Sequence, residues 1–205
     1  MKTFQSLCVF GDSTAYGAWD IEKGGWVNRL WMYFAEHDKN HHVNIQVYNL
    51  SIPGGTSDMI LDRFESEADM RDADALIFQT GGNDSAYENT PDNFIVSPEK
   101  FEANIETIIQ KAKVITKNII FVGFINCDES QTSPVFWRNI YYKNKNINAY
   151  NKIMKKVCEK NGILFLDTFG LLNNDDFADG LHPNASGHKK LFEAVKGFLQ
   201  KNKWI

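Results

Sequence analysis

The 205-residue sequence has little cysteine and no long apolar run. Its three cysteines, Cys8, Cys127 and Cys158, are widely spaced and lack any paired motif, which predicts free thiols in a reducing compartment. No apolar run approaches the roughly 20 residues that a membrane-spanning helix needs. The apolar stretch near the N-terminus is short and carries Gln5 and Ser6, so it does not resemble a signal peptide. We therefore expect a cytoplasmic protein with no stable membrane insertion.

The chain also carries no excess of positive charge. The chain holds 22 Lys and Arg against 26 Asp and Glu, a net charge of -4, and this balance gives no reason to expect a nucleic-acid partner. Residues 1–99 hold 6 basic and 16 acidic side chains, whereas residues 100–205 hold 16 and 10. We interpret this asymmetry as two solvated surfaces of opposite sign. The length and the ordinary charge content predict one globular domain over residues 1–205.

Strand-like and helix-like segments alternate along the chain. The apolar patterns predict strands over residues 4–10, 43–50, 73–79, 118–124 and 163–167. They predict helices over residues 26–37, 57–67, 98–116, 147–161 and 185–201. Gly162 is the expected C-cap of the fourth helix. This alternation favours an α/β fold, a three-layer α/β/α sandwich around a five-stranded, mostly parallel sheet.

Four polar segments follow the expected strands. The sequence Val-Phe-Gly-Asp-Ser ends at Ser13, Ser-Ile-Pro-Gly-Gly contains Gly54, Gly-Gly-Asn-Asp contains Asn83, and Asp-Gly-Leu-His-Pro contains Asp179 and His182. In an open parallel sheet, ligands bind beyond the carboxyl ends of the strands. We therefore expect all four segments to meet at one edge of the sheet.

These residue types fit nucleophilic catalysis. A serine hydroxyl is a poor nucleophile until a base removes its proton, so Ser13 needs a partner such as His182. Asp179 lies three residues before His182, where its carboxylate is placed to orient the imidazole and stabilise its charged form. The asparagine amide of Asn83 donates hydrogen bonds without carrying charge, which suits an oxyanion. We predict Ser13, Asp179 and His182 as the catalytic residues.

The four segments, in this order, resemble those of the SGNH hydrolase family, also called GDSL esterases and lipases. The resemblance spans nearly the whole chain and implies a flavodoxin-like strand order of 2-1-3-4-5. It also implies an oxyanion hole made by the backbone N–H groups of Ser13 and Gly54 and the side chain of Asn83. The chain departs from the family pattern at Thr14, where the family has leucine, and Gly55 adjoins Gly54. The family pattern favours Gly54 as the donor.

The sequence lacks the motifs of α/β-hydrolases, phosphate-binding loops and metal sites. The segment around Ser13 lacks the second glycine of a nucleophile elbow, and no glycine-rich phosphate loop is present. His41 and His42 are adjacent and have no third ligand nearby, so we interpret them as surface loop residues. His37 and His188 are expected on helix surfaces. No metal or other cofactor is predicted.

The sequence leaves the substrate open. The residues Tyr16 and Trp19, together with the aromatic segment 136–142, either line an acyl or aryl pocket or pack as ordinary loop core. Segment 130–143 is too short for a large lid, which favours small or short-acyl esters as the small-molecule substrate. An acyltransferase, a thioesterase, a lysophospholipase, a carbohydrate deacetylase or an arylesterase would use the same residues. A non-catalytic binding module is the alternative from another class, since one fold hosts many functions.

Overall fold

A parallel five-stranded sheet forms the centre of the protein. The structure, a computed structural model, describes residues 4–37 and 45–205. The strands of this sheet stand in the order β2-β1-β3-β5-β7, and every neighbouring pair is parallel. Their bounds are β1 Ser6–Gly11, β2 Gln46–Asn49, β3 Ala75–Gln79, β5 Ile119–Val122 and β7 Leu164–Leu166. Counted within this sheet alone, the order is the expected 2-1-3-4-5.

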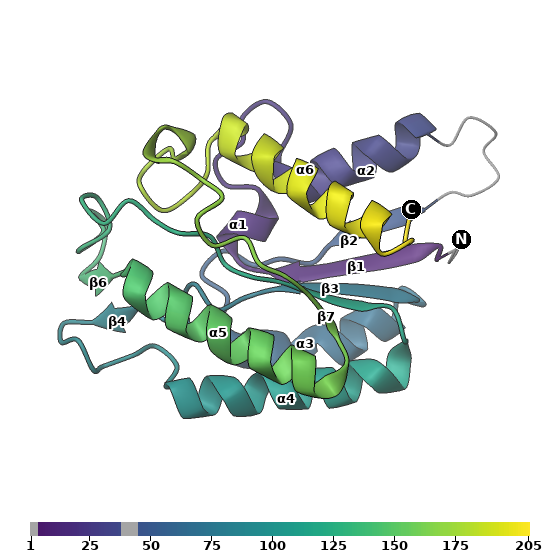
Figure 1. Cartoon of the computed structure of the whole chain (residues 1–205), viewed down its shortest axis with the longest axis horizontal. Helices are drawn as coiled ribbons and strands as arrows, with labels where there is room; N and C mark the ends of the chain where they lie inside the picture. Colours follow the sequence, from purple (N-terminus) through teal and green to yellow (C-terminus); the bar gives the residue numbers. More distant parts are fainter. Residues whose placement is uncertain (1–3, 38–44) are drawn as a thin grey trace.

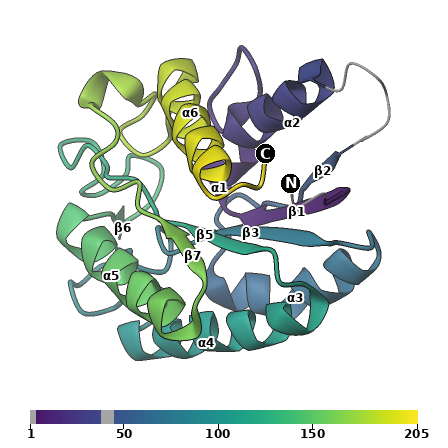
Figure 2. The same ribbon diagram turned by 45° about the vertical axis from the view of Figure 1, so that its right-hand side comes forward.

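Helices cover both faces of the sheet, as Figures 1 and 2 show. Helices α2 and α6 pack on one face, and α3, α4 and α5 pack on the other. The bounds of the α-helices are α1 Ser13–Tyr16, α2 Gly25–His37, α3 Ser57–Asp69, α4 Pro98–Ile115, α5 Asn144–Asn161 and α6 Ala185–Lys201. A short 3-10 helix, η1, covers Asn174–Asp176.

The sheet has a core on each face because its side chains alternate. In β1, Leu7 and Val9 point into the core beneath α2 and α6, whereas Cys8 and Phe10 point into the core beneath α3, α4 and α5. All four side chains are fully buried. A strand buried on both faces reads as a continuous apolar run, which is why the sequence pattern identified β1 readily.

The helix boundaries follow ordinary capping chemistry. Ser97 caps α4 by accepting a hydrogen bond from Lys100 N, and a proline occupies the first turn of that helix. Gly162 ends α5 in the left-handed conformation, which confirms the predicted C-cap. Helix α5 begins at residue 144, three residues earlier than the periodicity predicted.

A second, two-stranded sheet was not predicted. Strand β4 (Tyr87–Glu88) pairs antiparallel with β6 (Ile140–Tyr141). Strands of two residues carry too little periodicity to be recognised from sequence. The pairing fastens the segment after β5 to the segment after β3, at the carboxyl edge of the main sheet.

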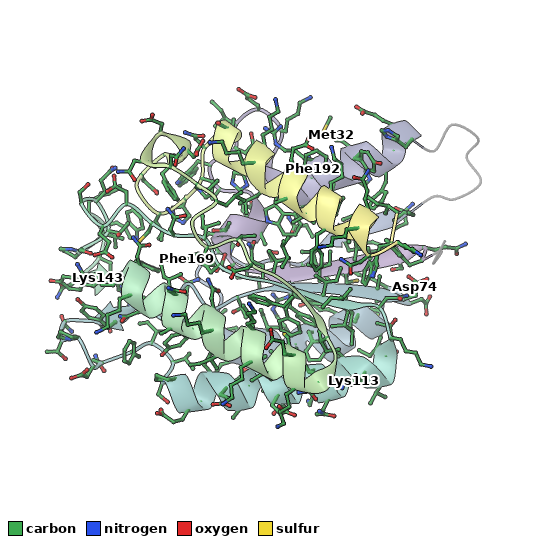
Figure 3. All side chains as sticks on the ribbon, in the orientation of Figure 1. Met32, Asp74, Lys113, Lys143, Phe169 and Phe192 are labelled. Carbon is green, nitrogen blue, oxygen red and sulfur yellow. The ribbon has the colours of Figure 1, made fainter. Side chains whose placement is uncertain are left out.

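The long connecting loops lie mainly at one end of the sheet. Asp74 precedes β3 at one end, where its carboxylate accepts hydrogen bonds from Gln5 N and Ser6 N. Lys143 precedes α5 at the opposite end of the molecule, as Figure 3 shows. The long connecting loops gather at this second end, which is the carboxyl end of the parallel strands. None of the helices in the described parts of the chain combines the length and apolar character needed to cross a bilayer.

We expect Ile105→Ala to destabilise the protein by about 2–5 kcal/mol, because it removes a buried side chain from α4 and leaves a cavity. Val114→Ala, in the same helix, is the matched control, since Val114 is 87% exposed. Urea denaturation measures both variants. Equal, small effects would contradict the assigned packing of α4.

Candidate active site

Ser13 stands at the first position of α1, two residues after the end of β1. Asp12 caps this short helix, and its Oδ1 accepts a hydrogen bond from Thr14 N at 2.9 Å. The turn is tight: a Cβ on Gly11 would lie 2.5 Å from Ala15 Cβ, so only glycine fits there. The backbone therefore presents the Ser13 hydroxyl at the carboxyl edge of the sheet.

His182 and Asp179 reach Ser13 from the loop between η1 and α6. The His182 Nε2 atom lies 3.0 Å from Ser13 Oγ, and His182 Nδ1 lies 2.7 Å from Asp179 Oδ2. These three predicted residues thus form one continuous hydrogen-bonded chain. With Asp179 accepting from Nδ1–H, Nε2 is the nitrogen left to accept the serine proton.

The carboxylate of Asp179 is held from several sides. Its Oδ1 accepts backbone hydrogen bonds from Leu181 N at 3.0 Å and His182 N at 2.8 Å. Its Oδ2 also accepts one from the indole nitrogen of Trp19 at 3.1 Å. Burial alone would raise the pKa of Asp179, but the hydrogen bonds and charge of His182 outweigh it and lower the pKa to about 2. Asp179 is therefore an anion at neutral pH.

Asn83 follows β3 and its side chain is fixed at both ends. Its Nδ2 donates to Gly55 O at 2.9 Å, and its Oδ1 accepts from the Tyr142 hydroxyl at 2.7 Å. The second hydrogen on Nδ2 remains for a ligand. The neighbouring Asp84 accepts hydrogen bonds from the Ser57 N–H and hydroxyl, which ties this loop to the start of α3. No sequence pattern indicated the contact between Tyr142 and Asn83.

Gly54 lies in the turn after β2 with a φ of 77°, a left-handed conformation that favours glycine. Among the described residues, neither Gly54 N nor Ser13 N donates a hydrogen bond. Both residues, with Asn83, line one pocket of about 1360 Å³ that also contains His182 and Asp179. The structure thus brings all five predicted site residues to one pocket. It can supply a nucleophile, a base and uncharged donors.

Aromatic side chains form much of the wall of this pocket. The pocket is lined by five of the aromatic residues that were predicted either to line a pocket or to pack as loop core: Tyr16, Trp19, Phe136, Trp137 and Tyr142. For these five, the first of the two predictions is confirmed. Ile140 and Tyr141, from the same aromatic segment, form β6 and are absent from the lining.

The expectation for His188 was wrong. The side chain is fully buried, and Nδ1 accepts a hydrogen bond from Trp26 N while Nε2 donates to Ala18 O at 2.9 Å. His188 shares a face of α6 with the buried Leu191 and Val195, at spacings of three and seven residues. That periodicity was the available signal for burial. Burial lowers the pKa of His188, which favours the neutral ring.

A second set of polar contacts holds the loop that carries Trp19. The buried Asp20 carboxylate accepts hydrogen bonds from the backbone of Lys23 and Gly25 and pairs with Arg29 Nε at 2.8 Å. Within the same loop, Trp19 N donates to Pro183 O at 3.0 Å. These contacts fasten the loop after α1 to the loop that carries His182.

The remaining candidates stay outside the pocket. Cys8, Cys127 and Cys158 are buried free thiols, and burial raises their pKa to about 11, 11 and 12, so they remain protonated. His37 is exposed on α2 as expected, and the pair at residues 41–42 lies outside the described residues. Within residues 4–37 and 45–205, no three His, Cys, Asp or Glu side chains group as metal ligands would.

Asp12 is an unusual buried carboxyl beside the nucleophile. It is 1% exposed, and within the described chain its Oδ2 has no hydrogen-bond partner. Burial raises the pKa of Asp12 to about 7, although the Thr14 N–H and the charge of His182 oppose this.

Comparisons with known proteins identify relatives of this chain. The family model described as "GDSL-like Lipase/Acylhydrolase family" matches residues 9–190. No curated protein matches the chain in sequence.

Solved structures share the fold. A lipase/acylhydrolase from Enterococcus faecalis is 19% identical, with a TM-score of 0.77 and 97% of each chain covered. Axe2, an acetylxylan esterase from Geobacillus stearothermophilus, is 22% identical, with a TM-score of 0.74 and coverage of 98% of this chain and 95% of the other. TesA is 22% identical, with a TM-score of 0.70 and coverage of 96% and 99%.

We expect Asp12→Asn to become more stable relative to the wild type as the pH rises. Between pH 3.8 and about 7 the unfolded chain ionises Asp12 while the folded chain keeps its proton. The unfolded state then binds fewer protons, so the free energy of unfolding of the wild type falls across this window. Asparagine keeps the cap to Thr14 N and cannot ionise.

Urea denaturation at about pH 4.5 and pH 8 measures this effect. The control is Asp92→Asn, which makes the same substitution at an exposed loop position. A constant difference for Asp12→Asn would show that Asp12 ionises normally in the folded protein.

Proposed function

Because the chain belongs to the GDSL-like lipase/acylhydrolase family, it is a carboxylic ester hydrolase, and we propose that it works through a covalent acyl-enzyme on Ser13. The observation that carries this proposal is the chain of hydrogen bonds from Ser13 Oγ through His182 to Asp179. The chain ends in a carboxylate that is ionised at neutral pH, as orientation of the imidazole requires.

The proposed reaction has two halves. Ser13 Oγ attacks the ester carbonyl carbon while His182 Nε2 takes the hydroxyl proton. The bond to the alcohol oxygen then breaks, and the same nitrogen returns the proton to the leaving alcohol. Water next gives a proton to His182 Nε2 while its oxygen attacks the acyl carbon; the bond from that carbon to Ser13 Oγ then breaks, and His182 returns the proton to Oγ, which releases the acid and restores the hydroxyl. Asp179 stabilises the imidazolium in both halves.

The negative oxygen of each tetrahedral intermediate needs donors that are already in place. We assign this role to Ser13 N, Gly54 N and Asn83 Nδ2, since all three residues line the same pocket. Tyr142 supports this role of Asn83, because its hydroxyl donates a hydrogen bond to Asn83 Oδ1 and so fixes the orientation of the amide. One amide hydrogen then donates to Gly55 O, and the other is left for the oxyanion.

The acyl group is proposed to be small or short. The segment between β5 and α5 contains β6, and its Tyr142 donates a hydrogen bond to Asn83. Because this segment supports the site itself, it does not serve as a large lid. Acyl transfer to an alcohol instead of water would use the same residues. Product analysis with added alcohol distinguishes the two outcomes.

We expect Ser13→Ala to abolish turnover of an aryl acetate and labelling by a fluorophosphonate, because both need the Ser13 oxygen. Intact mass spectrometry should find one adduct on the wild type and none on Ser13→Ala. Ser66→Ala, which removes an exposed hydroxyl on α3, should label normally. An unlabelled wild type would contradict the acyl-enzyme and favour a non-catalytic binding module.

We expect Asn83→Ala to lower kcat about 10²- to 10³-fold with a smaller change in KM, because a donor used in the transition state is lost. The matched control is Asn93→Ala. Asn93 also donates its side-chain amide to a backbone carbonyl, Glu88 O at 3.0 Å, but it is not part of the pocket lining. Equal kcat for Asn83→Ala and the wild type would remove Asn83 from the oxyanion hole.

A further inference from the structure

Two tryptophans flank His182 at the pocket wall. The Trp137 ring lies nearly parallel to the imidazole, with centroids 5.9 Å apart and planes at 25°. The Trp19 ring meets the imidazole edge-on, at 6.2 Å and 80°. Trp19 is 57% exposed and Trp137 is 48% exposed, so both present apolar surface to a ligand. The catalytic steps above do not use this aromatic surface.

The reaction places the alcohol part of the ester beside these rings. His182 Nε2 gives its proton to the leaving oxygen, which must therefore come within about 2.6–3.2 Å of that nitrogen. The first carbons of the alcohol then lie next to the imidazole and its two aromatic neighbours. A small acyl group occupies little of the pocket of about 1360 Å³, which leaves room for the alcohol.

Trp19 is held firmly in this position. Its indole N–H donates to Asp179 Oδ2, and its backbone N–H donates to Pro183 O in the loop that carries His182. The adjacent Asp20 is paired with Arg29. A rigid ring loses little conformational freedom on binding, so a wall of this kind is preorganised for its ligand.

Trp137 belongs to a hairpin-like loop with contacts of its own. Val135 N donates to Ile140 O at 2.9 Å across the base of the loop, and Arg138 pairs with Glu88 at 2.9 Å. Phe136 packs edge-on against Trp137, with centroids 4.7 Å apart. The loop thus presents the Trp137 ring beside His182.

We propose that Trp19 and Trp137 form an alcohol-side subsite that binds a ring with an apolar face, so that the substrates are esters of ring-containing alcohols. The proposal rests on the proposed function, because it uses His182 as the proton donor to the leaving alcohol. Aromatic faces stack on flat rings, and both an aryl ring and the C–H face of a pyranose offer such a surface. A flexible alkyl chain would lose more freedom on ordering against these walls.

The test uses three acetates with one acyl group and three primary alcohols: propyl acetate, benzyl acetate and a methyl 6-O-acetylglucopyranoside. We measure kcat/KM for the wild type, Trp137→Ala, Trp137→Phe and Trp31→Ala. Trp31 is the matched control. It is 46% exposed and lines the same pocket from α2, but among the described residues the rings paired with the His182 imidazole are those of Trp19 and Trp137, not that of Trp31.

The wild type should prefer at least one ring ester over propyl acetate. Trp137→Ala should lower that preference, the ratio of kcat/KM for the ring ester to kcat/KM for propyl acetate, roughly 3- to 10-fold, and Trp137→Phe should restore part of it. Trp31→Ala should keep the wild-type preference. A preference for the benzyl ester identifies an aryl alcohol, and a preference for the glucoside identifies a sugar alcohol.

Two outcomes would overturn the subsite: no ring preference in the wild type, or an unchanged preference in Trp137→Ala. Fluorophosphonate labelling separates these results from a failure of the proposed function. If the wild type is labelled at Ser13 but shows no preference for ring esters, the result contradicts only the subsite. If the wild type is not labelled, the result contradicts the acyl-enzyme and therefore the subsite as well.

Discussion

The contact between His182 and Ser13 joins segments that are 169 residues apart, and the proposed chemistry depends on it. If the imidazole moved by about 1 Å, His182 Nε2 would no longer be aligned to accept the proton of the Ser13 hydroxyl. The loop after η1 must therefore be fixed against the loop after β1. The backbone bond from Trp19 to Pro183 and the buried bond from His188 to Ala18 provide this link. The Asp20–Arg29 pair stiffens one side of it. These polar contacts surround the site without taking part in the chemistry.

Much of the fold was predictable because each central strand is buried on both faces and reads as an apolar run. The gathering of Ser13, Gly54, Asn83 and His182 followed from parallel strands sharing one carboxyl edge. The buried role of His188 was missed although its spacing to Leu191 carried the signal. The contacts Trp19–Asp179 and Tyr142–Asn83 join loops that are distant in sequence, and no local periodicity encodes such pairs.

The turn that presents Ser13 has an energetic cost. Asp12 caps α1, yet burial leaves one of its oxygens without a partner in the described chain and raises its pKa to about 7. A buried, half-satisfied carboxyl opposes folding at neutral pH. The charge of His182 partly offsets this cost, because it lowers the pKa of Asp12. The fold thus gives up some stability at the residue that precedes the proposed nucleophile.

The two sides of the pocket suggest different degrees of selectivity. The proposed oxyanion side is built from glycine backbone and from the Asn83 amide, which Gly55 and Tyr142 hold in place, and in this role it would recognise only the carbonyl common to all esters. The His182 side is walled by tryptophans from two separate loops, which can vary without disturbing the sheet. Discrimination among esters therefore falls mainly to Trp19 and Trp137. Trp19 also holds Asp179 through its indole N–H, so a change there would alter rate and selectivity together.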